Sequence, residues 1–515
     1  MQHLALRFFQ AQWASLRFYL FRITCGLYDL WKLVTFKEVH TTLAQKDASS
    51  DREHDTPRPF PLTSQQIDDK ICTFIDSVNK TAVCETVSEL YGDKPCRIID
   101  QKNGSFNICF FVRCDVVDVT LVLRIPIDPV TYNAWDKLVS EVTAMRYIER
   151  NTTIPIPHIH TYGRNKRLVE GASTPFMVMD CIKGQQLHTR TMMHATETQR
   201  KRLFIDLIDI LTQLRKLEFT SSGSLMPNPD GNESNPIVGP FLSMTANEFE
   251  RSYGVPVVSG NFTSVKHFID FHCHMLTETY RLPVEELDHR QAKEEIFALE
   301  SILKELPTYI DPQEHRHPFI LAHPDLRCGN IIVDDDFSIR GVIDWEFTSS
   351  IPLRMFTPPS WVTGHDPDML RIFTGTPRDK IFLEFCGVLE ERRNTSNTCA
   401  QLCQDWAFRQ GQPEQNGAFL LGLSSIVEIL RHPSSLADIF YSSIFRRSFG
   451  PTACQDAVIH DFFHHPDNEK LAEQVEVQVE KSARYTEYLR SQGLLVDDDQ
   501  SRQIREFLER TKHLV

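Results

Sequence analysis

Hydrophobic residues recur along this chain with two different spacings. Between residues 97 and 125, apolar positions come in short runs separated by turns, a pattern typical of β-strands. Later segments repeat apolar residues every three or four positions, as helices with one buried face do. The pattern therefore predicts an α+β fold, with a small β-rich lobe followed by a larger helical lobe.

Three strand-like runs and a helix define the predicted small lobe, which we place at residues 63–182. The runs cover residues 97–100, 107–114 and 120–125, and the helix covers residues 136–150. Another helical pattern begins near Thr63, and Ser64 is its expected N-cap.

The large lobe is predicted at residues 183–515. Helical periodicity is found at residues 199–217, 261–279, 292–306, 379–393, 416–430, 471–494 and 503–513. Residues 219–239 are rich in Ser, Asn, Pro and Gly and predict a loop.

Residues 1–40 carry a separate pattern, an extra N-terminal amphipathic helix. Its apolar face over residues 1–36 holds Phe9, Trp13, Leu16, Leu20, Leu27, Trp31 and Val34. Charged residues interrupt it too often for a bilayer span of about 20 apolar residues, and it lacks a secretory cleavage site. Two interpretations stay open: a mitochondrial presequence or membrane-surface anchor, and a helix packed on the folded domain. The polar residues 41–62 that follow predict a linker.

A β-hairpin with polar residues at both ends is predicted within residues 321–353. Two apolar runs, 331–333 and 339–343, are joined by an acidic turn. The polar residues around them are His323, Asp325, Asn330 and Asp344. Because a hairpin returns the chain on itself, Asp344 is expected beside Asn330 and within reach of Asp325.

Phosphoryl transfer is the chemistry that needs such a trio. One carboxylate orients an attacking hydroxyl and accepts its proton, which is the role that fits Asp325. A second carboxylate and an amide oxygen hold Mg²⁺ on the nucleotide phosphates, and Asp344 and Asn330 fit this metal-binding role. The alternative is that these residues only cap a surface turn.

Two short motifs resemble those of a known family. HPDLRCGN, from His323 to Asn330, resembles the H-x-D-x-x-x-x-N catalytic loop of aminoglycoside phosphotransferases and choline kinase relatives. IDWE, which contains Asp344, resembles their metal-binding D-F-G element. The resemblance covers about residues 63–440 and implies a bilobal protein-kinase-like fold that binds ATP. It also implies that His323 supports the catalytic loop.

The resemblance is to the fungal-type branch of that family, which has I-D-W-E-F and P-P-x-W stretches. Drug-modifying relatives usually show a G-D-P segment after the metal-binding aspartate, and none follows Asp344 here. Drug inactivation therefore loses support, and the substrate stays unassigned.

Nucleotide-binding residues are expected in the small lobe. The turn containing Gly104, Ser105 and Asn107 could cover phosphates with its backbone N–H groups, although it could equally be a plain hairpin turn. The resemblance implies that Arg124 contacts the phosphates in place of the commoner lysine and pairs with Glu141. The alternative for these two residues is an ordinary surface ion pair.

The connection between the lobes is expected after residues 176–180. The resemblance implies that the backbone around Met179 and Cys181 bonds the adenine edge. The side chain of Met179 or Ile182 could instead belong to the core. These two assignments depend on position alone.

Composition narrows the remaining possibilities. The net charge is −14, which disfavours nucleic-acid binding through a basic surface. The 13 Cys residues show no C-x-x-C pair, so we expect free thiols in an intracellular protein, cytoplasmic or mitochondrial. The His pairs lack partner ligands at zinc spacing.

These observations lead to one main hypothesis and two others. The main one is an ATP- and Mg²⁺-dependent phosphotransferase acting on a hydroxyl of a small molecule. The alternative is a kinase-fold protein that binds a nucleotide or a partner with little turnover. A protein kinase is disfavoured, because the chain has no H-R-D, D-F-G or A-P-E motif.

Overall fold

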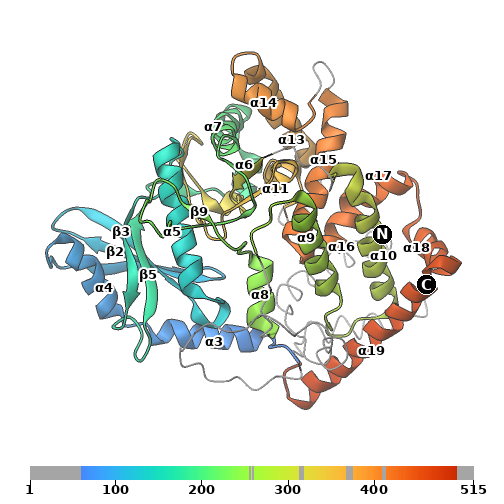
Figure 1. Cartoon of the computed structure of the whole chain (residues 1–515), viewed down its shortest axis with the longest axis horizontal. Coiled ribbons are helices and arrows are strands. Elements are labelled where there is room, and N and C mark those ends of the chain that lie inside the picture. Colours follow the sequence, from blue (N-terminus) through green and yellow to red (C-terminus); the bar gives the residue numbers. More distant parts are fainter. Residues whose placement is uncertain are drawn as a thin grey trace.

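The computed structural model describes residues 60–253, 257, 260–311, 318–366, 375–408 and 413–495. A β-rich lobe is followed along the chain by a larger, mainly helical lobe (Figure 1), which confirms the predicted α+β division. The predicted N-terminal helix, nearly all of the linker and the helix at 503–513 lie outside the described residues. No described helix is long and apolar enough to cross a membrane.

The small lobe is built on a five-stranded antiparallel sheet in the order β1-β2-β3-β5-β4. Its strands are β1 (Arg97–Asn103), β2 (Asn107–Cys114), β3 (Val119–Pro126), β4 (Ile159–Asn165) and β5 (Thr174–Asp180). Its helices are α3 (Ser64–Ser77), α4 (Lys80–Ser88) and α5 (Ala134–Asn151). Every strand and helix predicted in this lobe is present: β2 has the predicted bounds, and β1, β3 and α5 extend beyond theirs by a few residues. The cap of α3 was predicted wrongly: Thr63, not Ser64, accepts from the Gln66 N–H.

The two faces of this sheet belong to different hydrophobic cores, because successive side chains of a strand point in opposite directions. Leu121, Leu123 and Ile125 of β3 pack in a small core with α4. Val122 lies on the other face and joins the core that contains Leu138 of α5. Arg124 has the same parity as Val122, so the strand itself directs it toward α5.

The large lobe combines long helices with two small sheets. Its elements are β6 (Gln185–Gln186), α6 (Thr189–His194), α7 (Glu197–Arg215), β7 (Glu218–Phe219), β8 (Gly223–Met226), β9 (Ile237–Val238), α8 (Met244–Tyr253), α9 (Val265–Tyr280), α10 (His289–Tyr309), β10 (Phe319–Ala322), β11 (Ile331–Val333), β12 (Ile339–Val342), β13 (Ser349–Pro352), α11 (Ser360–Thr363), α13 (Gly375–Arg393), α14 (Asn397–Asp405), α15 (Pro413–Arg431), α16 (Leu436–Ile439), α17 (Phe445–Phe449), α18 (Gln455–His464) and α19 (Glu469–Ser491). The predicted helices within the described range are confirmed. The segment 219–239, predicted as a loop, contributes β8 and β9 to a sheet in the order β7-β10-β13-β8-β9.

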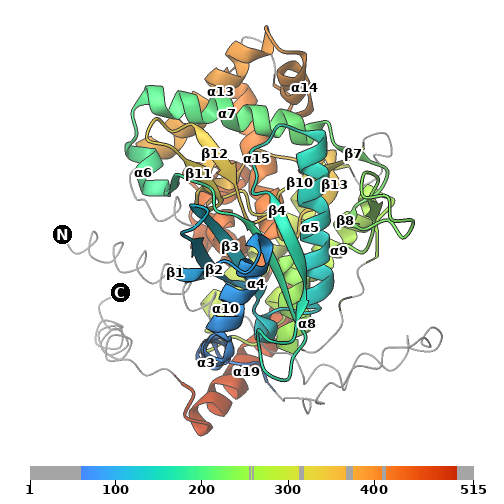
Figure 2. The ribbon, with the colours of Figure 1, turned by 90° about the vertical axis from the view of Figure 1, so that its left-hand side faces the viewer.

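The chain passes from the small lobe to the large one beside the β11–β12 hairpin, which lies above strands β1, β2 and β3 in Figure 2. Strand β6 follows β5 by a few residues and pairs with β11, so the sheet order is β12-β11-β6. Gly184 precedes β6 with φ +141°, and a Cβ there would come within 2.6 Å of the Val333 carbonyl oxygen. Only glycine allows both this backbone conformation and this approach. The segment that connects the lobes is therefore packed directly on the β11–β12 hairpin.

His272 is a buried histidine whose protonation links the stability of the folded protein to pH. It is buried on α9 against the rings of Phe241, Phe268 and Phe271, and its Nδ1 donates to the Leu430 carbonyl at 3.1 Å. Burial lowers its pKa from 6.5 to about 4. Between these values the unfolded chain binds a proton that the folded protein excludes. The stability contributed by the neutral ring is therefore present above pH 6.5 and lost as the pH falls to 4.

We expect the free energy of unfolding to fall by about 3 kcal/mol more between pH 6.5 and 4 in the wild type than in a His272→Phe variant. Urea unfolding at a series of pH values measures this difference. His274→Gln, at an exposed position of the same helix, is the matched control and should retain the wild-type pH dependence. If the free energy of unfolding changed equally with pH in the wild type and in His272→Phe, the lowered pKa of His272 would be contradicted.

Candidate active site

The predicted hairpin is present and brings the expected residues together. Strands β11 and β12 pair antiparallel, with Ile331 opposite Val342. Beyond the paired strands, the Ile343 N–H donates to the Asn330 carbonyl at 2.9 Å. This bond places Asn330 next to the start of the segment that carries Asp344.

The loop before the hairpin holds Asp325 in a fixed position. The Asn330 Nδ2 group donates to both the Asp325 carbonyl (2.8 Å) and its carboxylate Oδ2 (3.1 Å). Arg327 Nε lies 3.1 Å from the same carboxylate oxygen. Asp325 remains partly exposed, so its carboxylate is constrained and yet accessible.

His323 supports this loop through hydrogen bonds, as predicted. Its Nδ1 accepts from the Asp325 N–H at 3.2 Å, and its Nε2 donates to the Ile343 carbonyl at 3.0 Å. The ring also packs on Trp345, with centroids 4.7 Å apart. Burial lowers the pKa of His323 below its ordinary value, which favours the neutral ring that this pair of bonds requires. His323 therefore ties the loop of residues 323–330 to the end of the hairpin.

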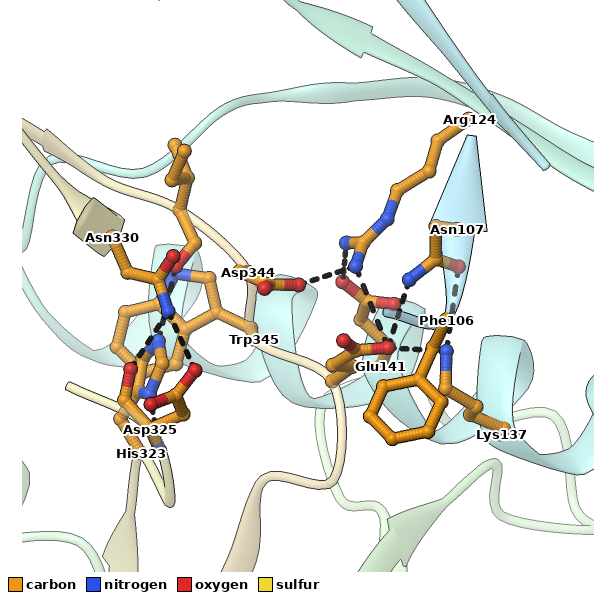
Figure 3. Close-up of polar contacts among 12 residues, drawn as sticks. Phe106, Asn107, Arg124, Lys137, Glu141, His323, Asp325, Asn330, Asp344 and Trp345 are labelled. Carbon is orange, nitrogen blue, oxygen red and sulfur yellow. Dashed lines mark hydrogen bonds and ion pairs between the residues drawn. The ribbon is translucent and has the colours of Figure 1, made fainter. Parts of the chain in front are cut away.

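Asp344 lies between two groups of polar residues (Figure 3). On one side are Asp325 and Asn330, and on the other is Arg124, whose Nη2 contacts Asp344 Oδ1. The Asp344 backbone has φ +66°, a left-handed conformation that Asp tolerates better than most residues. About a quarter of its side chain is exposed.

Arg124 joins the two lobes through a buried ion pair on each side. Its Nη1 contacts Glu141 of α5, while its Nη2 contacts Asp344 of the large lobe. Arg124 and Glu141 are 5% and 1% exposed, so the predicted pairing is correct and the surface ion-pair alternative is wrong. Burial raises the pKa of the Glu141 carboxyl, and the adjacent guanidinium opposes that rise. A guanidinium suits this position because its planar fork can bind two carboxylates at once.

Two residues of this network, Lys137 and Glu346, were not predicted. Lys137 Nζ contacts Glu346 Oε2 and lies 3.3 Å from Asn107 Oδ1. The Asn107 Nδ2 group donates to the same Glu346 oxygen at 2.8 Å. The sequence held two signals: Glu346 follows Asp344 by two positions, and Lys137 lies one helical turn before Glu141.

For the turn between β1 and β2, the sequence leaves two interpretations open, a cover over phosphates and a plain hairpin turn. Gly104 donates its N–H to the Asn107 carbonyl at 2.9 Å, so this group closes the turn and is not free for a phosphate in this conformation. Gly104 and Ser105 are exposed, whereas Asn107 is buried in the ion-pair network. For Gly104, the plain hairpin interpretation is the one that the structure shows.

The residues predicted at the lobe connection lie at the end of β5. Met179 is buried in the core, and the Asp180 N–H donates to the His158 carbonyl at 3.0 Å. Cys181 is half-buried just beyond the strand. Within the described chain, the main-chain N–H groups of Cys181 and Ile182 donate to no main-chain acceptor. These two N–H groups could therefore bind an external acceptor.

The site offers oxygen ligands of the type that Mg²⁺ prefers. Because the Asn330 amide nitrogen faces Asp325, its Oδ1 is directed away from that residue. Among the described residues, Asp344 Oδ1 contacts Arg124, whereas Asp344 Oδ2 accepts no hydrogen bond. A nucleotide-bound Mg²⁺ takes most of its ligands from phosphate and water, so one carboxylate and one amide oxygen are a sufficient protein contribution.

Comparison with known proteins gives a family match for the segment that contains this site. Residues 110–354 match the model of a family described as "Phosphotransferase enzyme family". This segment contains Arg124, Glu141, the catalytic loop and the hairpin.

A curated relative and two solved structures are also similar. The clavilactone A biosynthesis cluster protein Y of Ampulloclitocybe clavipes is 25% identical over 238 residues, 45% of this chain and 54% of that protein. The chain thus aligns with about half of that relative. The GDP and kanamycin complex of APH(2″)-IIIa is 14% identical, with a TM-score of 0.36, and the match covers 78% of this chain and 99% of that one. An ethanolamine kinase of Plasmodium vivax is 13% identical, with a TM-score of 0.38, and the match covers 77% of this chain and 98% of that one. TM-scores this low add no support, so the assignment depends on the family match and the site geometry.

Replacing Arg124 should test the buried network. We expect Arg124→Met to lower the free energy of unfolding by about 3–5 kcal/mol, because it leaves buried carboxylates without a cation. Arg124→Lys should lower the free energy of unfolding by less, because lysine keeps the positive charge and loses only the planar guanidinium that binds two carboxylates. Urea unfolding measures both changes. Arg167→Met, which removes an exposed arginine paired with Glu85 and Glu89, is the control and should have little effect. An equally small effect for Arg124→Met would contradict the importance of this network.

Proposed function

We propose that the protein is a small-molecule kinase, because residues 110–354 match the model of the phosphotransferase enzyme family. It would use ATP and Mg²⁺ and transfer the γ-phosphate to a hydroxyl group. The observation that carries this proposal is the hairpin, which gathers Asp325, Asn330 and Asp344 opposite the Arg124–Glu141 pair.

Asp325 is the proposed proton acceptor. The acceptor hydroxyl oxygen attacks the γ-phosphorus, the bond from that phosphorus to the β–γ bridging oxygen breaks, and ADP leaves. The hydroxyl proton passes to the Asp325 carboxylate. Asn330 holds this carboxylate in one orientation, so little motion is needed at the moment of reaction.

Asn330 and Asp344 are the proposed metal ligands. A bound Mg²⁺ would neutralise charge on the nucleotide phosphates. Arg124 supplies fixed positive charge beside Asp344, and Glu141 keeps the guanidinium in place. The main-chain N–H groups of Cys181 and Ile182 are proposed donors to the nucleotide base.

A small-molecule acceptor agrees with the name of the fungal relative, which places that protein in a biosynthesis cluster. The name does not identify an acceptor, and none is assigned to this chain.

A second candidate is a nucleotide-binding protein with little turnover. It is favoured by one observation: both ends of the Arg124 guanidinium are already paired, with Glu141 and with Asp344. A residue held in this way is less free to contact phosphates than a lysine would be.

Turnover should depend on Asp325. We expect Asp325→Asn to lower kcat by about 10²–10⁴-fold, the usual contribution of a positioned acid or base, and to leave nucleotide affinity unchanged. The assay is phosphate transfer from ATP to a panel of alcohols, amino alcohols and sugars. Asp335→Asn, in the exposed hairpin turn, is the matched control and should behave as wild type. Nucleotide binding without turnover in every protein would favour the second candidate, and equal turnover in wild type and Asp325→Asn would reject the role of Asp325.

Nucleotide binding should depend on Asp344. Asparagine is the suitable replacement, because it tolerates the left-handed backbone at this position. We expect Asp344→Asn to weaken Mg²⁺-dependent ATP binding about tenfold or more, since it removes the anionic metal ligand. Isothermal titration calorimetry with and without Mg²⁺ measures this loss. Unchanged affinity in the variant would reject the whole site assignment.

A further inference from the structure

The ion-pair network contains more carboxyl groups than cations. Arg124 and Lys137 are the two cations, and Glu141, Asp344 and Glu346 are the three acids in contact with them. Four of these side chains are at most 10% exposed, and only Asp344 is more open to solvent. Within this cluster of described residues, the acids therefore exceed the cations by one, and the cluster includes the proposed metal ligand Asp344.

Asp344 and Glu346 compete for the same nitrogen of Arg124. Arg124 Nη2 contacts Asp344 Oδ1 and lies 3.5 Å from Glu346 Oε2. The stronger the pull of Glu346 on this nitrogen, the weaker the hold of Arg124 on Asp344. A carboxylate released from the guanidinium is free to bind a cation.

Lys137 controls how much charge Glu346 can offer to Arg124. Its Nζ contacts the same Glu346 oxygen that faces Arg124. The Lys137 side chain is 2% exposed, and its Nζ lies 5.8 Å and 5.3 Å from the ring centroids of Phe106 and Phe347. This enclosure excludes water, so the attraction between Lys137 and Glu346 is only weakly screened.

We propose that Lys137 and Glu346 are positioning residues that set the affinity of Asp344 for Mg²⁺. Glu346 draws Arg124 away from Asp344, and Lys137 restrains Glu346. The proposal deepens the proposed function and rests on it, since it concerns the metal ligand of that site.

The two residues should act in opposite directions. Glu346→Gln removes the negative charge that competes with Asp344 for Arg124. Arg124 then holds Asp344 more strongly, so Mg²⁺ binding should weaken. Lys137→Met removes positive charge and lets Glu346 compete fully for Arg124, so Mg²⁺ binding should strengthen. The double variant keeps the wild-type charge balance and should return close to the wild-type affinity. A side chain with only a packing role would not produce shifts of opposite sign.

The experiment measures equilibrium binding of a non-hydrolysable ATP analogue at pH 8 over a range of Mg²⁺ concentrations. We expect the half-saturating Mg²⁺ concentration to rise about tenfold in Glu346→Gln and to fall about tenfold in Lys137→Met. It should return to within about threefold of wild type in the double variant. Lys201→Met and Glu391→Gln remove the same charges from an exposed pair on α7 and α13 and should leave the value unchanged.

Thermal unfolding of each variant shows whether it is folded. If Lys137→Met alone does not fold, Lys137→Arg and the double variant replace it: Lys137→Arg keeps the charge and should bind as wild type, and the double variant should reverse the effect of Glu346→Gln.

Shifts of the same sign in the two single variants, or no shift where Asp344→Asn gives one, would overturn the role of this pair and leave the proposed function intact. Analogue binding that is absent or independent of Mg²⁺ in the wild type would overturn the proposed function and this inference together.

Discussion

The buried guanidinium of Arg124 is the contact on which the arrangement of this site depends. It binds Glu141 of its own lobe and Asp344 of the other, 220 positions away in the sequence. A buried cation is costly unless its charge is fully matched, so each of these contacts requires the others. The relative position of the lobes at the site is therefore coupled to the placement of a few charged atoms.

The rest of the site is held by the backbone of one hairpin. Strands β11 and β12 bring residues 330 and 344 together, and His323 connects the loop before the hairpin to the carbonyl after it. Strand β6 adds the lobe connection to the same small sheet. A rigid support of this kind suits phosphoryl transfer, which relies mainly on positioning and on fixed charge.

The charged residues of the site fall into a buried group and a partly exposed group. Lys137, Glu141 and Glu346 are buried, whereas Asp325 and Asp344 each keep about a quarter of their side chain exposed. Buried charges of this kind do little for stability compared with apolar groups of the same size. Their value lies in specifying where the exposed carboxylates sit.

The sequence by itself determined the local elements and the motif residues. Period-two and period-3.6 patterns predicted the strands and helices. The order His323, Asp325, Asn330, hairpin, Asp344 predicted which side chains would meet, because a short hairpin returns the chain beside its own start.

The tertiary structure alone decided the ion pairs that were not predicted, those of Arg124 with Asp344 and of Lys137 with Glu346. Nothing in the order of residues states that Asn107, Lys137 and Glu346 converge on one point, because their contacts arise where α5 packs between the sheet and the segment after the hairpin. It likewise decided that the amide of Gly104 closes its own turn, since that depends on the register of β1 with β2. Local patterns follow from neighbouring residues, whereas the pairing of buried charges follows from which elements pack together.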